Sequence, residues 1–146
     1  MLPTVAEVLA LDVMRRGEPR VVAGTDRLGT LVRWVHAIEL ADAARLLRGG
    51  ELVLTTGIAL PDEGPLLDAY VAGLASVGIA GLAVELGRRY TGGLPASFVT
   101  AAESHRLPLI DGYSFRDIHR QRRLLHVRSG RDDQHFSFVH AAGHFI

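Results

Sequence analysis

The chain has neither cysteine nor lysine among its 146 residues. Without cysteine the protein cannot form a disulfide, use a thiolate nucleophile or bind a metal through sulfur, which excludes disulfide-stapled domains and cysteine-ligated zinc modules. Several enzyme signatures are also missing, because the sequence holds no G-x-S-x-G elbow, no Walker A loop and no dinucleotide-binding fingerprint. We therefore expect neither an enzyme nor a bound cofactor.

Long apolar runs are absent as well. No segment reaches the roughly 18 apolar residues that a membrane span needs. The first residues, MLPTVAEVLALD, lack the basic start and the long apolar stretch of a signal peptide. The length suits a single compact domain with a buried core. We therefore expect a cytoplasmic protein that makes no contact with a membrane.

Charge is balanced over the whole chain but not along it. The 16 arginines match 16 acidic residues, so the chain has no general attraction for nucleic acid, and we expect no direct DNA binding. Residues 1–115 hold 10 Arg and 13 acidic residues, whereas residues 116–146 hold 6 Arg, 3 Asp and five of the seven His. His135, His140 and His144 are spaced by five and four residues. No carboxylate lies in register with them, so we expect no physiological metal site.

Helix and strand patterns alternate along the first 111 residues. Thr4 and Glu7 fit a capping box that begins a short helix. The segments ELVLTT at residues 51–56 and GIAGLAVEL at 78–86 contain continuous apolar stretches typical of strands buried on both faces, and the segment between them has apolar residues at helical spacing. The pattern predicts an α/β fold, a three-layer, open, mostly parallel sheet with helices on both faces.

Two further strands are predicted before the central one. They cover residues 20–24 and 31–40, and the turn residues TDRLG separate them. They form either an antiparallel pair or a strand, a loop and a strand. A last short strand at residues 107–111 completes the pattern.

The stretch RGGELVLTTG, residues 48–57, brackets the predicted central strand with two glycines and a Thr-Thr-Gly turn. Ligands of open α/β sheets bind outside the carboxyl ends of the strands, where Thr55, Thr56 and Gly57 lie. Two hydroxyls can donate or accept hydrogen bonds, and a glycine lets the backbone approach a ligand. The alternative for each residue is an ordinary role in the strand or turn. We predict that this turn contacts a ligand.

Other candidate ligand contacts come from the neighbouring segments. Trp34 and His36 share a face by the two-residue period and would suit a flat heterocycle such as a purine derivative, although a core Trp and a hydrogen-bonded His remain the alternative. Glu85 ends an apolar strand next to arginines, so its burial requires pairing with an Arg or contact with a ligand. The predicted ligand-binding residues are Trp34, His36, Glu39, Thr55, Thr56, Gly57, Glu85 and Arg88.

Three runs carry a resemblance to a known family. They are RWVHAIELADAARLLRGGELVLTTGIAL at residues 33–60, AYVAGLASVGIAGLAVELG at 69–87 and LPASFVTAAESHRLPLID at 94–111. Together they resemble the N-terminal domain of the purine catabolism regulator, or PucR-like, transcription regulators. The resemblance implies a sensory domain that binds a small effector, for which a purine catabolite is a candidate. In full-length family members this domain precedes a helix-turn-helix domain, which this sequence does not contain.

The resemblance ends near Gly112, and this sets the predicted domain boundary. Residues 1–111 form the predicted sensory domain, and residues 112–146 form a divergent, Arg/His-rich tail for which partial disorder is one expectation. The tail is either a divergent helix of a short stand-alone protein or the product of a truncated or out-of-frame coding region, and its composition favours the second. We expect residues 1–111 to fold without residues 116–146.

Three functions of different classes follow from these observations. The first is a ligand-sensing module of a homodimeric transcription regulator, in which the effector shifts the population of active states. The second is a dimerisation module without a small-molecule ligand. The third is a small enzyme, which requires that His36, Glu85 and Asp111 meet at one end of the sheet.

Overall fold

The structure is a computed structural model of the chain, which describes residues 2–62 and 64–115 and the backbone of three short strands between residues 126 and 140. The elements are α1 (Val5–Leu9), α2 (Asp12–Arg15), β1 (Arg20–Ala23), η1 (Thr25–Arg27), β2 (Trp34–Ala37), η2 (Ala43–Leu46), β3 (Glu51–Thr55), α3 (Pro65–Val77), β4 (Gly81–Glu85), α4 (Ala96–Ser104), β5 (Leu109–Gly112), β6 (His126–Val127), β7 (Gln134–His135) and β8 (Phe138–His140), where η marks a 3-10 turn. No helix in this described part is long and apolar enough to cross a membrane.

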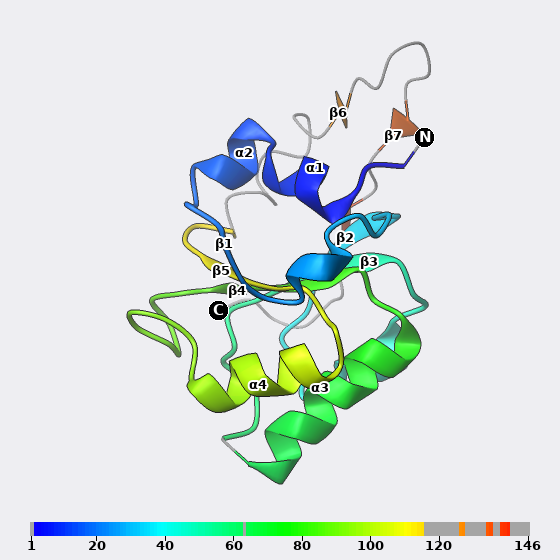
Figure 1. Cartoon of the computed structure of the whole chain (residues 1–146). Coiled ribbons are helices and arrows are strands. Elements are labelled where there is room, and N and C mark those ends of the chain that lie inside the picture. Colours follow the sequence, from blue (N-terminus) through cyan, green and yellow to red (C-terminus); the bar gives the residue numbers. More distant parts are fainter. Residues whose placement is uncertain (1, 63, 116–125, 128–133, 136–137, 141–146) are drawn as a thin grey trace.

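The larger sheet has the strand order β1-β5-β4-β3-β2-β8. Strands β2 to β5 run parallel, and β8 runs parallel to β2. At the other edge, β1 runs antiparallel to β5. Figure 1 shows α1 and α2 on one face of this sheet and α3 and α4 side by side on the other. The predicted three-layer, mostly parallel α/β fold is confirmed.

The strands predicted at residues 20–24 and 31–40 do not pair with each other. β1 lies at the edge beyond β5, whereas β2 lies on the other side of the sheet beside β3. The antiparallel alternative was therefore wrong, and the two segments form a strand, a loop and a strand. The edge suits β1 because Arg20 can keep a largely exposed side chain there while its guanidinium binds Asp111 of β5 at 2.8 Å.

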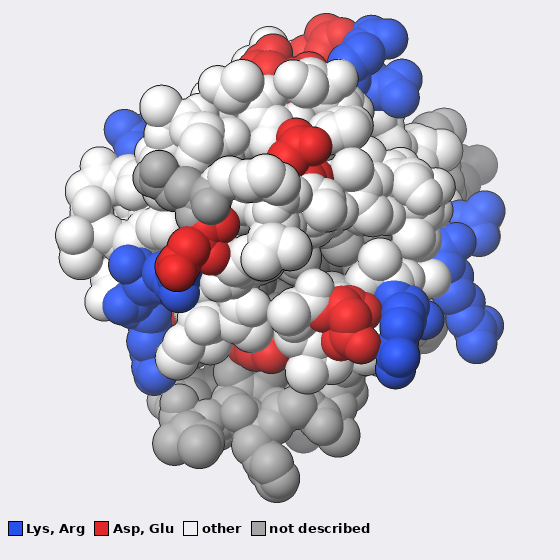
Figure 2. Space-filling model, turned by 90° about the horizontal axis from the view of Figure 1, so that it is seen from below, with Lys and Arg blue, Asp and Glu red and all other residues white. Residues whose placement is uncertain are grey.

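Most arginine side chains lie away from the outer face of α3 and α4. Seen from that side, they gather toward the margin, and several acidic side chains lie scattered among uncharged residues within the face (Figure 2). The exposed positions of α3 include Leu66 and Ala69 besides Asp68. This face therefore offers little positive charge to solvent.

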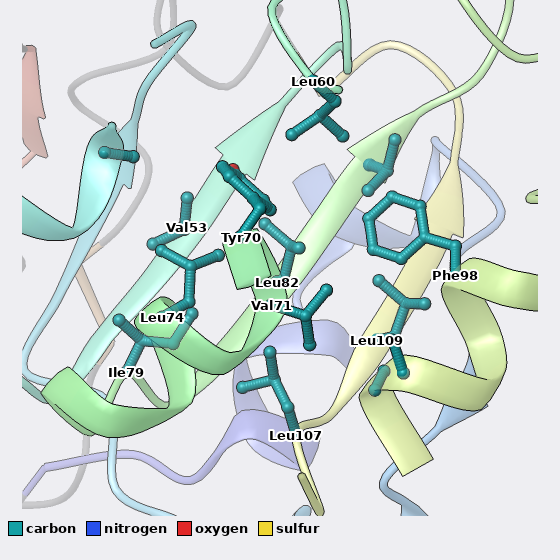
Figure 3. Packing of buried hydrophobic residues seen from close by; sticks show 14 of the residues in the cluster. Val53, Leu60, Tyr70, Val71, Leu74, Ile79, Leu82, Phe98, Leu107 and Leu109 are labelled. Atoms are coloured by element: carbon teal, nitrogen blue, oxygen red, sulfur yellow. The ribbon is translucent and has the colours of Figure 1, made fainter. Parts of the chain in front are cut away.

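Alternation along the central strands supplies two hydrophobic clusters, one on each face of the sheet. Figure 3 shows the cluster on the α3 and α4 side, where helix side chains pack on Val53, Leu82 and Leu109 of the sheet. Its largest helical contributors are Leu67, Tyr70, Val71, Leu74 and Phe98. The cluster on the other face joins α1 and α2 to the sheet through Val5, Val8, Met14, Leu52, Leu54 and Ile110. Both faces of β3 are buried, as the apolar run predicted.

Phe115, the last residue that the structure describes before the tail, is buried against the α1 and α2 side of the sheet. The described core thus includes a residue beyond position 111, where the sequence predicts the domain boundary. From the tail, β8 adds a three-residue strand at the edge beside β2. The three tail histidines lie outside the residues whose side chains the structure describes.

We expect deletion of residues 116–146 to lower the free energy of unfolding by less than about 1 kcal/mol, because residues up to Phe115 already build a hydrophobic cluster on each face of the sheet, and the entropy cost of ordering the tail offsets what its burial adds. Urea unfolding of the full and shortened chains measures the difference from the transition midpoints. A loss of several kcal/mol, or an insoluble shortened chain, would show that the tail is part of the core.

Candidate functional site

The amino end of β3 explains the first half of RGGELVLTTG. Glu51 is fully buried, and its Oε1 accepts the backbone N–H groups of Arg48 at 2.6 Å and of Gly49 at 2.9 Å. Gly50 adopts a φ of +82°, and a Cβ at this position would lie 2.8 Å from the Arg33 side chain. The two glycines therefore form the turn that leads into β3, and the Glu51 carboxylate accepts hydrogen bonds from the backbone N–H groups of that turn.

The carboxyl end of β3 is organised by a second carboxylate, from Glu39 beyond β2. One Glu39 oxygen accepts the Thr55 hydroxyl at 2.9 Å, and the other accepts the Thr56 N–H. The Thr55 hydroxyl oxygen in turn accepts the Gly57 N–H at 3.1 Å. Thr55 and Thr56 are each 5% exposed. The structure thus brings together four of the predicted residues, Glu39, Thr55, Thr56 and Gly57, in a turn whose polar groups bind one another.

Gly57 is needed where it stands because a tyrosine ring lies against it. Its φ is +82°, and a Cβ would lie 2.7 Å from Cε2 of Tyr90. The Tyr90 ring also makes an edge-to-face contact with Phe98 of α4, with the ring centroids 6.1 Å apart. Tyr90 is therefore fixed between the turn after β3 and the core beneath α4.

Outside this turn lies a pocket of about 350 Å³. It opens between the connection from β3 to α3 and the connection from β4 to α4. In its wall the Arg89 guanidinium donates to Asp62 at 2.7 Å and lies 5.6 Å from the centroid of the Tyr90 ring. The lining residues are Pro61, Asp62, Leu67, Arg89, Tyr90 and Pro95.

Helix α3 brings the hydroxyl of Tyr70 toward the same end of the sheet. Burial raises the pKa of this hydroxyl, and the nearby Glu39 carboxylate and Tyr90 raise it further. The group therefore keeps its proton at neutral pH. It provides a neutral hydroxyl near the Glu39 turn and leaves the charge of this region to Glu39, Asp62 and Arg89.

The other predicted residues do not join this cluster. Trp34 begins β2 and pairs with Glu51, so it lies at the opposite end of the parallel strands from Glu39. His36 is buried in the middle of β2, level with Val53.

Glu85 lies beside the predicted turn but on the adjacent strand, because Val84 pairs with Thr55 and Glu85 is therefore level with Thr56. Glu85 is buried at the end of β4, and alternation puts it on the face of Ala83, away from Val84 and the α3 side. Arg88 is exposed and is not among the pocket-lining residues.

The three residues of the enzyme hypothesis are also apart. Val53 of β3 pairs with His36 of β2 on one side and with Leu82 of β4 on the other. His36 is therefore two strands away from Glu85 and level with Leu82, which lies three positions before Glu85. Asp111 of β5 binds Arg20 through both carboxylate oxygens, at 2.9 and 2.8 Å. The structure therefore does not assemble an acid and base group from them.

None of the six residues that line the pocket, nor Tyr70 near them, was among the predicted ligand-binding residues, and Asp62, Arg89 and Tyr90 are the polar and aromatic members of the lining. The signal that could have found three of them is their place in the connections that follow two buried strands, because adjacent parallel strands bring such connections to one edge. Both connections lead to helices on the same face. The pocket lies outside the carboxyl ends of the strands, as predicted for the ligand site, but not where successive crossovers diverge to opposite faces of the sheet.

A second groove, of about 550 Å³, lies on the other side of the molecule between α1 and β1. Its wall is mainly apolar and includes Leu9, Val21 and Leu28. It lies away from the carboxyl ends of the parallel strands and holds none of the predicted residues. Within the described part of the chain, no group of three or more potential metal ligands comes together.

Comparison with solved structures supports the fold. The chain resembles the CBS and DRTGG domains of the regulatory region of Clostridium perfringens pyrophosphatase, a structure complexed with the activator diadenosine tetraphosphate. The TM-score is 0.50 and the sequence identity 10%, over 80% of this chain and 47% of the other. The chain thus spans about half of that protein chain. A search of curated proteins gave no match.

The family comparison covers most of the chain. The model of the purine catabolism regulatory protein-like family matches residues 7–121. These residues include every lining residue of the candidate pocket and all strands of the larger sheet except β8. The predicted resemblance is therefore confirmed, and the chain belongs to the purine catabolism regulatory protein-like family.

Proposed function

We propose that this domain senses a small metabolite for a transcription regulator and binds it in the pocket between the β3–α3 and β4–α4 connections. The observation that carries the proposal is the fixed position of Arg89 and Tyr90 in the pocket wall. Tyr90 is held by Gly57 and Phe98, and Arg89 lies beside its ring. A planar aromatic ring next to a cation suits a flat polar ligand.

The predicted turn residues have a supporting role in this proposal. Glu39 fixes Thr55 and Thr56, and the Thr55 hydroxyl oxygen accepts the N–H of Gly57, against which Tyr90 lies. The turn thereby holds one wall of the pocket without offering its own buried hydroxyls. We extend the ligand-binding assignment from the turn to Arg89 and Tyr90 for this reason.

Ligand binding at this place would reach the outer layer of the protein directly. Leu67 of the pocket lies in the first turn of α3, and Pro95 is the N-cap of α4. A ligand that binds one arrangement of these two helices more tightly shifts the population toward that arrangement. This is how a pocket of this size can signal to a second copy of the chain or to another domain of the regulator.

The comparisons favour a small-molecule effector over catalysis. The family is regulatory, and the resembling pyrophosphatase region is the regulatory part of its protein and is complexed with a nucleotide activator. We therefore propose a cytoplasmic, non-enzymatic sensor whose effector is a purine catabolite.

A thermal-shift screen of the full chain tests this function. We expect one of urate, xanthine, hypoxanthine, allantoin and allantoate to raise the melting temperature. At 100 times the dissociation constant the stabilisation is about 2.7 kcal/mol, or roughly 8 °C for a domain of this size. The variant Tyr90→Leu should lose this response, because it keeps apolar contact with Phe98 but lacks the aromatic face.

The matched control is Tyr113→Leu, because Tyr113 is an exposed tyrosine that does not line the pocket. It should respond to the ligand as the unchanged chain does. If no compound of the panel stabilises well-folded protein, or if both tyrosine variants respond equally, the pocket is not the sensor site.

A dimerisation module without a ligand is the second candidate. The observation that favours it is the outer face of α3 and α4, where few arginines lie and the Leu66 side chain is 72% exposed. Light scattering over a range of concentrations distinguishes the two functions. A dimer whose stability no ligand changes supports the second candidate, whereas a concentration-independent monomer excludes it.

A further inference from the structure

The two partners of the ion pair in the pocket wall, Arg89 and Asp62, differ in how far their side chains are exposed. The Arg89 side chain is 27% exposed and lies beside the Tyr90 ring, whereas the Asp62 side chain is 98% exposed. Arg89 is therefore the fixed partner, and Asp62 can leave it at small cost because water solvates the released carboxylate. An exposed ion pair of this kind adds little stability to the fold.

The charges around the pocket favour an anion once Asp62 leaves. Among the described residues that line it, Arg89 is the one cation and Asp62 the one anion. Helices α3 and α4 both begin at the pocket, at Gly64 and Pro95, and neither has a side-chain N-cap hydrogen bond. Their N-termini add partial positive charge to that of Arg89.

We propose that the pocket takes an acidic small molecule whose negatively charged group replaces the Asp62 carboxylate at Arg89 while its flat body lies on Tyr90. This rests on the sensor function proposed above and adds the chemical class of the effector. A planar guanidinium binds a carboxylate or phosphate through two parallel hydrogen bonds, which gives the exchange its preference for oxyanions.

The exchange also provides a route for the signal. Asp62 lies in the connection that leads from β3 into α3, three residues before the helix begins at Pro65. While Asp62 binds Arg89, it links this connection to the one that leads into α4. An acidic ligand breaks that link and releases the start of α3 from the β4–α4 connection.

Three variants and three probes test the exchange. The probes are inorganic phosphate, urate, which is an anion at neutral pH, and hypoxanthine, which is neutral there. Calorimetry of the full chain should show that urate binds more tightly than hypoxanthine. Arg89→Gln should weaken urate binding at least about tenfold, and Asp62→Asn should strengthen it several-fold because the competing carboxylate is gone.

The control is Asp26→Asn, which removes the acid of another exposed pair, between Asp26 and Arg106 at 2.6 Å. Urate affinity should not change in this variant. As a second readout, phosphate should shift the Arg89 side-chain NMR signal more in Asp62→Asn than in the unchanged chain.

Two outcomes would overturn the exchange. Equal binding of hypoxanthine and urate, both insensitive to Arg89→Gln, would mean a neutral effector and would leave the sensor function standing. No shift of the Arg89 signal by phosphate in Asp62→Asn would exclude an anion site at Arg89, whichever probe binds elsewhere.

Discussion

Replacing Glu51 with alanine is expected to lower the free energy of unfolding by about 3 kcal/mol, the largest effect that a single polar residue of the described core should have. Glu51 is fully buried and accepts the backbone N–H groups of Arg48 and Gly49. Alanine would leave both donors without their acceptor at the start of the central strand. Urea unfolding of the purified variant, compared with the unchanged chain, measures the loss.

Two further variants show whether the buried donors cause this effect. Glu51→Gln keeps one carbonyl oxygen as an acceptor and should lose about half as much stability. Glu7→Ala removes the exposed carboxylate of the capping box at Thr4, which accepts the Thr4 N–H at 3.3 Å, and should lose about 1 kcal/mol or less. A Glu51→Ala variant no less stable than Glu7→Ala would contradict this account of the glycine pair.

Replacing Glu39 with alanine should affect both stability and ligand response. The change removes the acceptor of the Thr55 hydroxyl and of the Thr56 N–H, in residues that are almost fully buried, so we expect a loss of about 2 kcal/mol. The turn that places Gly57 against Tyr90 should then loosen. Any ligand found in the thermal-shift screen should bind Glu39→Ala at least about tenfold more weakly, which corresponds to about 1.4 kcal/mol.

Hydrogen exchange gives an independent measurement of the same turn. The Thr56 and Gly57 amides should exchange faster in Glu39→Ala relative to the amides of β3. The matched control is Glu103→Ala, because the Glu103 carboxylate also accepts one backbone N–H, that of Gly24, at 2.8 Å. Glu103 lies near the end of α4, whose start lines the pocket. Equal loss of ligand affinity in both variants would mean a general loss of stability and not a role of the turn.

Together these predictions assign a separate carboxylate to each end of the central strand. Glu51 binds the backbone that enters β3, and Glu39 binds the backbone and hydroxyl that leave it. Neither carboxylate lines the pocket. Glu39 is expected to affect the ligand through the position of Tyr90, and Glu51 is expected to affect only the stability of the fold. Arg89 and Tyr90 are the residues expected to touch it.

The fold class was readable from the sequence because it depends on local patterns. Within ELVLT the three central residues are apolar without alternation, which is typical of a strand covered on both faces, and the structure buries all of β3. The capping box at Thr4 and Glu7 likewise needs only residues three positions apart, and it begins α1 as expected. The family resemblance was also carried by continuous runs of sequence.

The strand order and the composition of the pocket depend on contacts between distant residues. Whether β1 pairs with β2 or with β5 is not encoded in either strand, and the tertiary structure chose β5, nearly ninety positions later in the chain. Arg89 and Asp62 are 27 residues apart and meet because β3 and β4 are adjacent and parallel.

The sequence by itself determined that a Thr-Thr-Gly turn follows a buried strand of an α/β sheet, at the edge where the strands have their carboxyl ends. Only the tertiary structure decided that both threonines are buried and that the Thr55 hydroxyl binds Glu39. The physical reason is that a buried hydroxyl must find a partner, and Glu39, 16 residues away, supplies one for Thr55. The pocket outside this turn is therefore lined by residues further from the strand, including Asp62, Arg89 and Tyr90.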